Sequence, residues 1–448
     1  MKDKQVAQAT TTRNPWLWIP TLYFAEGIPY FIVNNISVLM LAKMGVPNGQ
    51  MALFTSLLYL PWTIKPFWSP FVDIIKTKRW WVISMQILMS VAFVLLTLAM
   101  PKPTPDVIAT GQTPISMFYI TLMLFVITAF ASATHDIAAD GFYMLALTQK
   151  MQAAFVGIRS TFYRLSSIFG QGVLVYIAGA IETKYNNIPL SWQVTMGVSA
   201  VIFCLVTLYH TFAIPKPAAD KSHIAGTQGA ASAGQIMREF GQSFATFFKK
   251  PGLLLAILFM LLFRLPEAFL IKMCTPFLVA GREVGGLGLS TENVGLVYGT
   301  IGVFFLTIGG ILGGIYASRV GLKKSLWVMA ACMTLPCLTF CYLAELLPTN
   351  LVSISIAIAI EQFGYGFGFT AYMLYMIYFS EGEFKTSHYA ICTAFMALSM
   401  MIPGMFAGYI QEALGYANFF WMVIACCAAT LLVTYFVDRK IDPDYGHK

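Results

Sequence analysis

The sequence predicts an all-α membrane protein whose twelve transmembrane helices form two six-helix halves around a central cavity. Composition is the first observation behind this prediction: of 448 residues, 58% are hydrophobic and 11% are charged, with a mean hydropathy of +0.71. A soluble domain carries roughly 25% charged residues. The second observation is a series of long apolar runs, and the third is a single long polar gap near the middle of the chain.

The apolar runs have the length of about 20 residues that crosses a ~30 Å hydrocarbon core. They cover 16–42, 50–73, 80–100, 115–146, 151–181, 191–212, 251–280, 291–317, 324–346, 351–379, 386–412 and 418–437. The first run is too long for a cleavable signal peptide and lacks a small-residue cleavage site. The polar gap predicts an N-terminal half at 1–212, a cytoplasmic linker at 213–250 and a C-terminal half at 251–448. The linker segment "PKPAADKSHIAGTQGAASAG" is flexible in composition.

Lysine and arginine predict the orientation, because cytoplasmic loops carry an excess of both. Of the 28 such residues, five lie within the apolar runs and four lie on one set of turns, namely Lys43, Lys102, Lys184 and Arg282. The other nineteen lie on the side of the termini, so both termini are predicted to be cytoplasmic. The net charge of +8 therefore reflects topology. Nucleic-acid binding is not expected, because the basic residues are spread over short loops.

Enzymatic and metal-binding motifs are missing from the sequence. The eight cysteines lie inside apolar runs and form no CxxC pair, and there is no HExxH, no GxSxG and no glycine-rich phosphate loop after a strand. No cofactor is predicted, and a membrane receptor or membrane acyltransferase is disfavoured because neither a sizeable soluble domain nor a catalytic motif is present. The expected partners are a small-molecule substrate, protons and the lipid bilayer, with the protein a monomer.

The two halves resemble each other. The first run contains "YFAEGIPYF" and the seventh contains "FRLPEAFLI", so each has a glutamate near its start, Glu26 and Glu267. The turns after the second and eighth runs, "PFVDIIKTKRW" and "GGIYASRVGLKKS", are both basic. Two parallel six-helix halves joined by a long cytoplasmic loop resemble the major facilitator superfamily.

The proline-rich segment "YLPWTIKPFWSPFVD", residues 59–73, is predicted to be a membrane helix, where neighbouring helices can satisfy the carbonyls that proline frees. Asp73 resembles the aspartate of the superfamily's cytoplasmic 2–3 loop motif, which implies a gating role shared with Arg79 and Arg319. Lys65 is also a gating candidate. A buried ammonium needs a partner or a wet pocket, and the alternative is that it snorkels to the interface.

The same segment is similar to a narrower family. "KPFWSPFVD" resembles the K-F-x-W-x-P-x-x-D signature of the muropeptide permease (AmpG) and acetyl-CoA transporter branch. "FASATHDIAADGFYMLAL" resembles that family's fourth span, with Asp136 and Asp140 on the matching acids, and "SHYAICTAF" resembles its eleventh. In "FRLPEAF" a glutamate replaces the family's aspartate, and His135 replaces a neutral amide. Family permeases often carry two further C-terminal spans, whereas this sequence ends with "DRKIDPDYGHK".

The resemblance implies a proton-coupled importer in the inner membrane of a Gram-negative-type bacterium. The implied cargo is a peptidoglycan turnover product, N-acetylglucosaminyl-1,6-anhydro-N-acetylmuramic acid (GlcNAc–anhydroMurNAc) with or without its peptide, or a related amino sugar. The alternative is an importer of another small anionic solute: a monosaccharide such as N-acetylmuramate, a peptide, a siderophore or an acetyl-CoA-like molecule. The ending after the twelfth run slightly favours a smaller cargo.

Five acids inside apolar runs are the candidates for proton coupling, because a charge in a membrane helix costs roughly 2.5–3.5 kcal/mol on insertion scales. They are Glu26, Asp136, Asp140, Glu267 and Glu361. Asp136 and Asp140 are four residues apart and share one helix face, where each opposes the ionisation of the other. The alternative is that they form ion pairs with Arg159 and Arg164, and the two interpretations are compatible.

Aromatic, amide and cationic side chains inside the runs are the candidates for binding substrate. They are Tyr30, Asn34, Asn35, Arg159, Arg164, Gln171, Arg264, Lys272, Gln362 and Tyr365. Aromatic and amide groups suit sugar rings and N-acetyl groups. The cations suit a muramic lactyl group or a peptide carboxylate, and the arginine fork matches a carboxylate best.

Overall fold

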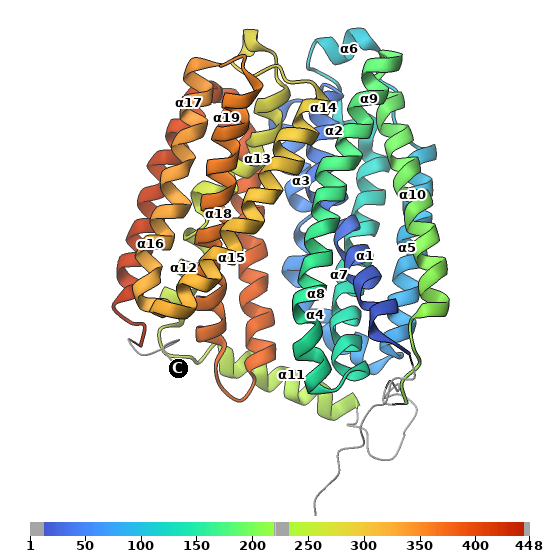
Figure 1. Ribbon diagram of the computed structural model, residues 1–448, viewed down its shortest axis with the longest axis vertical. Helices are drawn as coiled ribbons and strands as arrows, with labels where there is room; N and C mark the ends of the chain where they lie inside the picture. The colour runs from blue at the N-terminus through green and yellow to red at the C-terminus, as the bar shows by residue number, and fades with distance from the viewer. Residues whose placement is uncertain (1–12, 219, 221–232, 443–448) are drawn as a thin grey trace, which may run out of the picture.

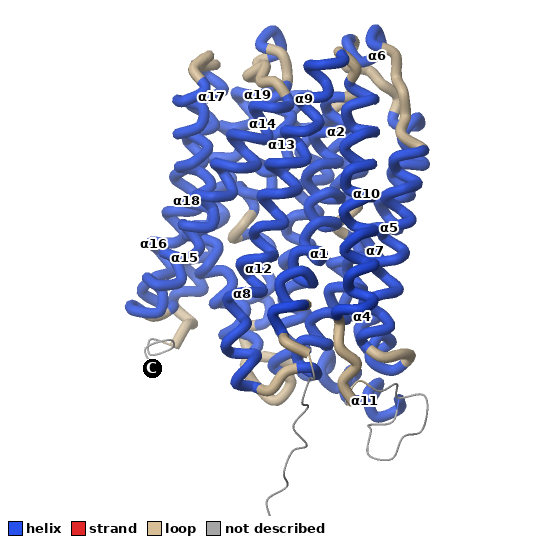
Figure 2. The backbone as a smooth tube through the Cα atoms, turned by 45° about the vertical axis from the view of Figure 1, so that its right-hand side comes forward, coloured by secondary structure: helices blue, strands red, loops and turns tan. Residues whose placement is uncertain are grey.

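The structure is a computed structural model that describes residues 13–218, 220 and 233–442. The side chains of Asp73, Gln149, Lys150, Ala153, Ala154, Val156 and Ala233 also lie outside the description. Within these residues the chain forms a bundle of long helices and no strand (Figures 1 and 2). The predicted all-α class is confirmed.

The helices fall into two groups that lie side by side in Figure 1, with an additional helix, α11, across one end. The N-terminal group comprises α1 (Ile19–Phe31), η2 (Ile32–Ile36), α2 (Ser37–Lys43), α3 (Asn48–Leu57), α4 (Leu60–Ile74), α5 (Lys78–Leu98), α6 (Pro105–Ala109), α7 (Tyr119–Ala146), α8 (Gln149–Ser167), η4 (Ile168–Leu174), α9 (Val175–Tyr185) and α10 (Ile188–Ala213). The C-terminal group follows α11 (Ala233–Phe247) and comprises α12 (Leu253–Leu262), α13 (Leu265–Val279), α14 (Thr291–Val294), η7 (Gly295–Gly302), α15 (Val303–Val320), α16 (Leu322–Thr334), α17 (Leu338–Leu346), α18 (Leu351–Ser380) and α19 (Lys385–Asp438).

Ten helical stretches in the described residues are long and apolar enough to cross a membrane. Two local features explain why this number differs from the twelve expected runs. Helix α19 contains both the eleventh and the twelfth run, which meet at Gly415 with φ 75° and ψ 167°, a conformation open to glycine because it has no Cβ. The second run is present as α3 and α4, which are separated at Leu58 and Tyr59.

The proline-rich segment forms α4 as predicted. Pro61 lies in the first turn of the helix, where a missing N–H costs nothing. Pro66 and Pro70 lie inside it, so they leave the carbonyls four residues earlier without their helical donor. Phe67 and Phe71 point outward from α4, with 58% and 47% of their surface exposed.

The two groups touch most closely near the end of the bundle that carries α6 (Figure 1). Glycines make this approach possible: a Cβ on Gly299 would lie 1.9 Å from the carbonyl oxygen of Gln171, and one on Gly408 would lie 2.0 Å from that of Asn48. Polar contacts join the groups there as well. The Asn48 amide donates to Gln411 Oε1 at 2.7 Å, and Thr291 Oγ1 donates to Glu182 Oε2 at 2.5 Å. We call Asn48, Glu182, Thr291 and Gln411 the α6-end seal.

Helix α11 lies across the opposite end of the bundle (Figure 1). Its phenylalanines recur on one face, and they pack against both groups: Phe244 contacts Phe67 of α4 at 5.3 Å between ring centroids, and Phe247 contacts Phe395 of α19 at 6.4 Å. The second part of the linker is therefore an ordered amphipathic helix, because apolar residues at helical spacing find apolar partners there. Most of the segment predicted to be flexible, 215–234, lies outside the described residues.

Candidate functional site

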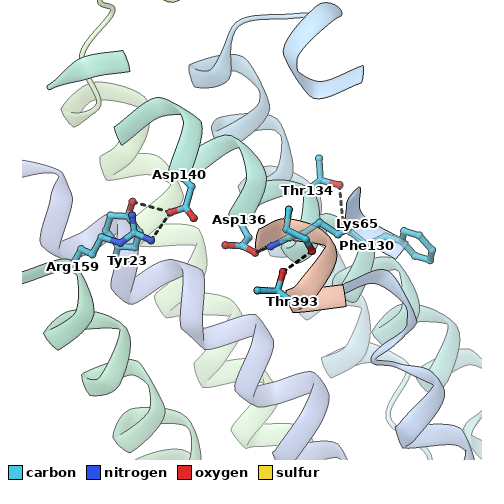
Figure 3. A network of polar contacts seen from close by, with 9 residues as sticks. Tyr23, Lys65, Phe130, Thr134, Asp136, Asp140, Arg159 and Thr393 are labelled. Carbon is cyan, nitrogen blue, oxygen red and sulfur yellow. Dashed lines mark hydrogen bonds and ion pairs between the residues drawn. The ribbon is translucent and has the colours of Figure 1, made fainter. Parts of the chain in front are cut away.

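A cluster of charged side chains lies inside the N-terminal group (Figure 3). Lys65 of α4 donates a hydrogen bond to Asp136 of α7. Arg159 of α8 lies 2.7 Å from Asp140, and the Tyr23 hydroxyl of α1 donates to the same carboxylate at 3.2 Å. Each aspartate of α7 therefore has one cation, and the two pairs join α1, α4, α7 and α8.

Glu26 adds a third carboxyl group without adding a cation. Glu26 is 8% exposed. One carboxylate oxygen from each of Glu26, Asp136 and Asp140 lies within 4.8 Å of the other two. Among the described residues, Glu26 Oε2 has no hydrogen-bond partner. Three carboxylates against Lys65 and Arg159 leave one net negative charge when all are ionised. In a medium of low dielectric the neutral arrangement is the cheaper one, so the cluster has room for one proton.

The cluster is partly open to solvent, unlike the rest of the buried charge. The side chain of Asp140 is 40% exposed and that of Asp136 is 20% exposed. Both lie in the second half of α7, which runs toward the end of the bundle that carries α11. Solvent therefore reaches the carboxylates of this cluster.

The C-terminal group holds two further acids in its interior. Glu267 of α13 and Glu361 of α18 are 0% and 1% exposed. Glu361 Oε2 accepts a hydrogen bond from Gln362 Nε2 at 2.8 Å, whereas both oxygens of Glu267 lack a partner among the described residues. Neither carboxylate forms an ion pair with a described side chain. Buried carboxyl groups of this kind are expensive to ionise.

Arg264 lies three residues before Glu267 in the sequence but is held by aromatic rings. Its Nη2 donates to the Tyr365 hydroxyl at 2.5 Å, and its guanidinium lies 4.7 Å from the Phe369 ring centroid and 5.7 Å from that of Tyr372. Cation–π contact stabilises a guanidinium away from water. Arg264 is therefore stabilised by rings of its own helix group, whereas its Nε has no hydrogen-bond partner among the described residues.

Lys272 of α13 reaches across to the other group. Its Nζ donates to Thr55 Oγ1 of α3 at 3.0 Å and lies 5.8 Å from the centroid of the Tyr59 ring. A cavity of about 20 Å³ adjoins it, lined by residues of both groups. The polar lining residues are Asn34, Asn35, Tyr59, Lys272, Thr275 and Tyr298. Asn34 and Asn35 lie in η2, a π-helical turn, and such turns are frequent at functional sites.

The other predicted binding residues are spread along the interface. Tyr30 packs edge-on against Trp62 at 5.2 Å, and Gln171 donates to Ser167 Oγ at 2.8 Å. Arg164 faces α15, since a Cβ on Gly310 would lie 3.2 Å from its Nη2. Arg164 has neither an ion pair nor a hydrogen bond with a described residue. The suggested ion pairs are thus realised for Asp140 with Arg159, whereas Asp136 pairs with Lys65 instead of Arg164.

The predicted gating residues are not gathered in one place. Lys65 lies in the charge cluster and does not snorkel to the interface, because Asp136 offers it a nearby carboxylate. Arg79 donates to the carbonyls of Thr211 and Ile214 at 2.6 and 3.2 Å, which ties α5 to the end of α10 within one group. Arg319 is exposed in the last turn of α15. The side chain of Asp73 lies outside the description.

A polar chain behind the cluster was not predicted from the sequence. His135 Nε2 lies 3.0 Å from Gln86 Nε2, Gln86 Oε1 lies 3.0 Å from His210 Nδ1, and His210 Nε2 lies 2.9 Å from Thr21 Oγ1. Nor were Thr55, Tyr59 and Tyr298 around the cavity predicted. Histidine and glutamine in otherwise apolar runs were the available signal for the chain. Nothing in the sequence singles out Thr55, because its partner Lys272 comes from the other helix group.

Comparisons with known proteins agree with this arrangement. The family model of the Major Facilitator Superfamily matches residues 21–383. "Putative transporter AmpG 4" of Rickettsia conorii is 25% identical over 429 residues, which is 94% of this chain and 96% of that protein. "Anhydromuropeptide permease" of Escherichia coli is 24% identical over 421 residues, which is 92% of this chain and 77% of that protein.

Solved structures show the same fold at low sequence identity. A D-xylose–proton symporter matches with a TM-score of 0.70 and 12% identity over 96% of this chain and 98% of that chain. A bacterial homologue of the human lysosomal transporter Spinster, in an inward-facing and unoccupied conformation, matches with a TM-score of 0.67 and 15% identity over 95% and 96%. The chain therefore belongs to the Major Facilitator Superfamily, as an AmpG-like multi-pass secondary transporter of the membrane.

Proposed function

We propose that this transporter imports peptidoglycan turnover products together with protons, across the bacterial inner membrane and with both termini in the cytoplasm. The proposed cargo is GlcNAc–anhydroMurNAc, with or without its peptide, or a related amino sugar. The name of the E. coli relative, an anhydromuropeptide permease, supports this class of cargo. Another small anionic solute is the alternative.

One observation carries the proton coupling: the cluster of Glu26, Asp136 and Asp140 holds three carboxyl groups for two cations. When Glu26 is ionised, it competes with the two aspartates for Lys65 and Arg159. When one proton binds, two complete ion pairs remain and the cluster is neutral. Protonation thus changes how firmly four helices of the N-terminal group are held together, which is the kind of change that biases a conformational equilibrium.

The positions of the seal and the cluster suggest how the cycle runs. The basic turns assign the α11 end to the cytoplasm and the α6 end to the outside. On that assignment the seal closes the outer side, and the partly exposed Asp140 releases its proton inward. Cargo and proton would bind from outside when the seal opens, because the fully loaded interior then carries the least net charge.

The experiment is uptake into proteoliposomes that hold the purified protein, driven by an imposed inward proton gradient. The panel contains GlcNAc–anhydroMurNAc, its tripeptide form, N-acetylmuramate and a dipeptide. We expect accumulation of the anhydro sugar that stops when a protonophore is added, and no accumulation driven by a sodium gradient alone. Accumulation that ignores the proton gradient contradicts the coupling, and selective uptake of a different solute contradicts the cargo.

A further inference from the structure

Lys272 is a buried cation whose charge the described structure leaves unbalanced. It is 6% exposed, and it forms one hydrogen bond, to Thr55 Oγ1. No described carboxylate lies within ion-pair distance of it, and two of its three N–H groups have no acceptor among the described residues. An ammonium in this position costs free energy unless something supplies a negative charge.

The hydrogen bond to Thr55 has a fixed direction. Thr55 Oγ1 donates its own hydrogen to the carbonyl oxygen of Met51 at 2.7 Å, so its lone pairs are what it offers to Lys272. A neutral hydroxyl is a weaker partner for an ammonium than a carboxylate is. An anion that reached Lys272 would therefore displace Thr55, and with it a contact between the two helix groups.

The neighbouring cavity offers a second unused polar atom. Asn34 is 3% exposed and donates its amide to the Tyr30 carbonyl at 3.1 Å, whereas its Oδ1 has no partner among the described residues. Asn34 and Lys272 both line the cavity. The cavity therefore presents an open acceptor beside an unbalanced cation, which matches a molecule with an amide N–H or hydroxyl close to a carboxylate.

The other intramembrane cations are less suited to this role. Lys65 and Arg159 already have aspartate partners, and Arg264 is enclosed by Tyr365 and Phe369. Arg164 is also without a carboxylate, but it is only partly buried, so water already screens much of its charge. Lys272 is the cation that is buried, has no described carboxylate partner and lines the cavity between the two groups.

We propose that Lys272 and Asn34 form the subsite that binds the carboxylate end of the cargo, and that Lys272 holds the two helix groups together through Thr55 until that carboxylate arrives. This inference rests on the proposed function. At about 20 Å³ the cavity has room for little more than a water molecule. Binding of a carboxylate must therefore widen the interface, which links recognition of the charge to release of the Thr55 contact.

The test is equilibrium binding to the purified full chain at one fixed pH, with GlcNAc–anhydroMurNAc and its methyl ester as probes. The two probes differ in the lactyl carboxylate alone. We expect the parent to prefer the acid by about tenfold to a hundredfold, the value of one charge-assisted hydrogen bond. Lys272→Met should remove that preference and leave ester binding within a few-fold, and Lys272→Arg should keep it.

Two further variants separate recognition from structure. Thr55→Val removes the cross-group acceptor and should keep the preference for the acid. Lys43→Met removes a lysine that already pairs with Glu182 at 2.8 Å and should also keep it. Because Met replaces an unbalanced charge, Lys272→Met should melt at the parent's temperature or above, whereas a lysine with a purely structural role would lower the melting temperature.

The outcomes are distinguishable. If Lys272→Met retains the parent's preference for the acid, or if Thr55→Val loses it to the same extent, the subsite is wrong and the proposed function stands. If the parent binds both probes equally, the subsite is wrong as well. If the parent binds neither probe, the proposed cargo is wrong and the inference falls with it.

Discussion

At the scale of single residues, Glu26 differs from the two aspartates beside it. Asp136 and Asp140 each have a cation, and Glu26 has none, although its carboxylate lies within the same 4.8 Å group. Because Glu26 has no cation partner, its protonation is the change that brings the net charge of the cluster to zero. The aspartates, by contrast, set where Lys65 and Arg159 are held.

Glu26→Gln should uncouple transport from the proton gradient. The variant keeps the shape of the side chain and leaves two acids for two cations, so the cluster is neutral without a proton. Downhill exchange of cargo should persist, and accumulation driven by a pH gradient should fall by tenfold or more. The measurement compares both activities in proteoliposomes, and a variant that still accumulates cargo like the parent would contradict this role. Glu383→Gln, a change at an exposed glutamate between α18 and α19, is the control and should accumulate cargo like the parent.

The ion pair of Lys65 and Asp136 should show strong coupling in a double-mutant cycle. Asp136→Asn leaves Lys65 without a carboxylate partner, and breaking a fully buried pair costs about 3–5 kcal/mol. Here the loss should be smaller, because 23% and 20% of the two side chains are exposed. Adding Lys65→Met should recover part of the lost thermal stability. Additive losses in the double variant would show that the two side chains do not depend on each other.

At the scale of secondary structure, the contact between η4 and η7 relies on glycine. Gly299 lies where a Cβ would come within 1.9 Å of the Gln171 carbonyl oxygen. Both segments are π-helical, so each already departs from regular helix geometry where the two groups meet. The close backbone contact in turn helps to keep the α6 end shut.

Gly299→Ala should weaken closure at the α6 end. The added methyl group clashes with backbone that cannot move aside easily, so the population shifts toward states in which the groups are farther apart there. Distance measurements between spin labels on α9 and α14 should show a longer mean separation. Uptake of the cargo should be slower than in the parent. Gly314→Ala on the following helix is the control, because a Cβ there meets nothing within 4 Å. Equal distances in both variants would contradict the argument.

The helices could be predicted from the sequence more fully than the breaks and bends within them. The twelve apolar runs correspond to helices, because length and hydropathy suffice to identify a membrane span. The break at Leu58 and the merging of two runs at Gly415 depend on local backbone conformation, which hydropathy does not report. For the site, helical spacing alone predicts that Asp136 and Asp140 lie on one face. That Glu26 and Lys65 join them could not be predicted, because it depends on how α1 and α4 pack against α7.

At the scale of the whole molecule, the two helix groups are joined by polar contacts at the α6 end and by α11 at the other. The seal consists of a few hydrogen bonds, such as that from Asn48 to Gln411 at 2.7 Å. Hydrogen bonds of this kind contribute about 1 kcal/mol each, so the closed arrangement is held weakly enough to open during transport.

Cross-linking the seal should stop transport reversibly. In a variant without the native cysteines, Asn48→Cys and Gln411→Cys would be joined by a short cross-linker that forms a disulfide with each thiol. The cross-link prevents the α6 end from opening. Uptake should fall to background and return on reduction, whereas each single-cysteine variant should be unaffected by the reagent. As a matched control, a cross-link between Glu345→Cys and Trp421→Cys, whose exposed side chains are hydrogen-bonded within the C-terminal group, should leave uptake intact. Persistent uptake through the cross-linked seal would contradict alternating opening at this end.

The merging of two spans in α19 has a mechanical consequence. Gln411 of the seal lies four residues before the bend at Gly415, and beyond the bend the helix presents Trp421, Leu432 and Phe436 to its surroundings, with 49%, 58% and 48% of their surface exposed. The two arms meet at one non-helical residue, Gly415, without an intervening loop, so a change of tilt in one arm displaces the adjoining end of the other. Because membrane helices adjust their tilt to the local hydrocarbon thickness, lateral forces on the lipid-facing arm reach the seal directly. We therefore expect the turnover rate to depend on acyl-chain length, in reconstituted bilayers of a single lipid, even when cargo and proton gradients are held constant.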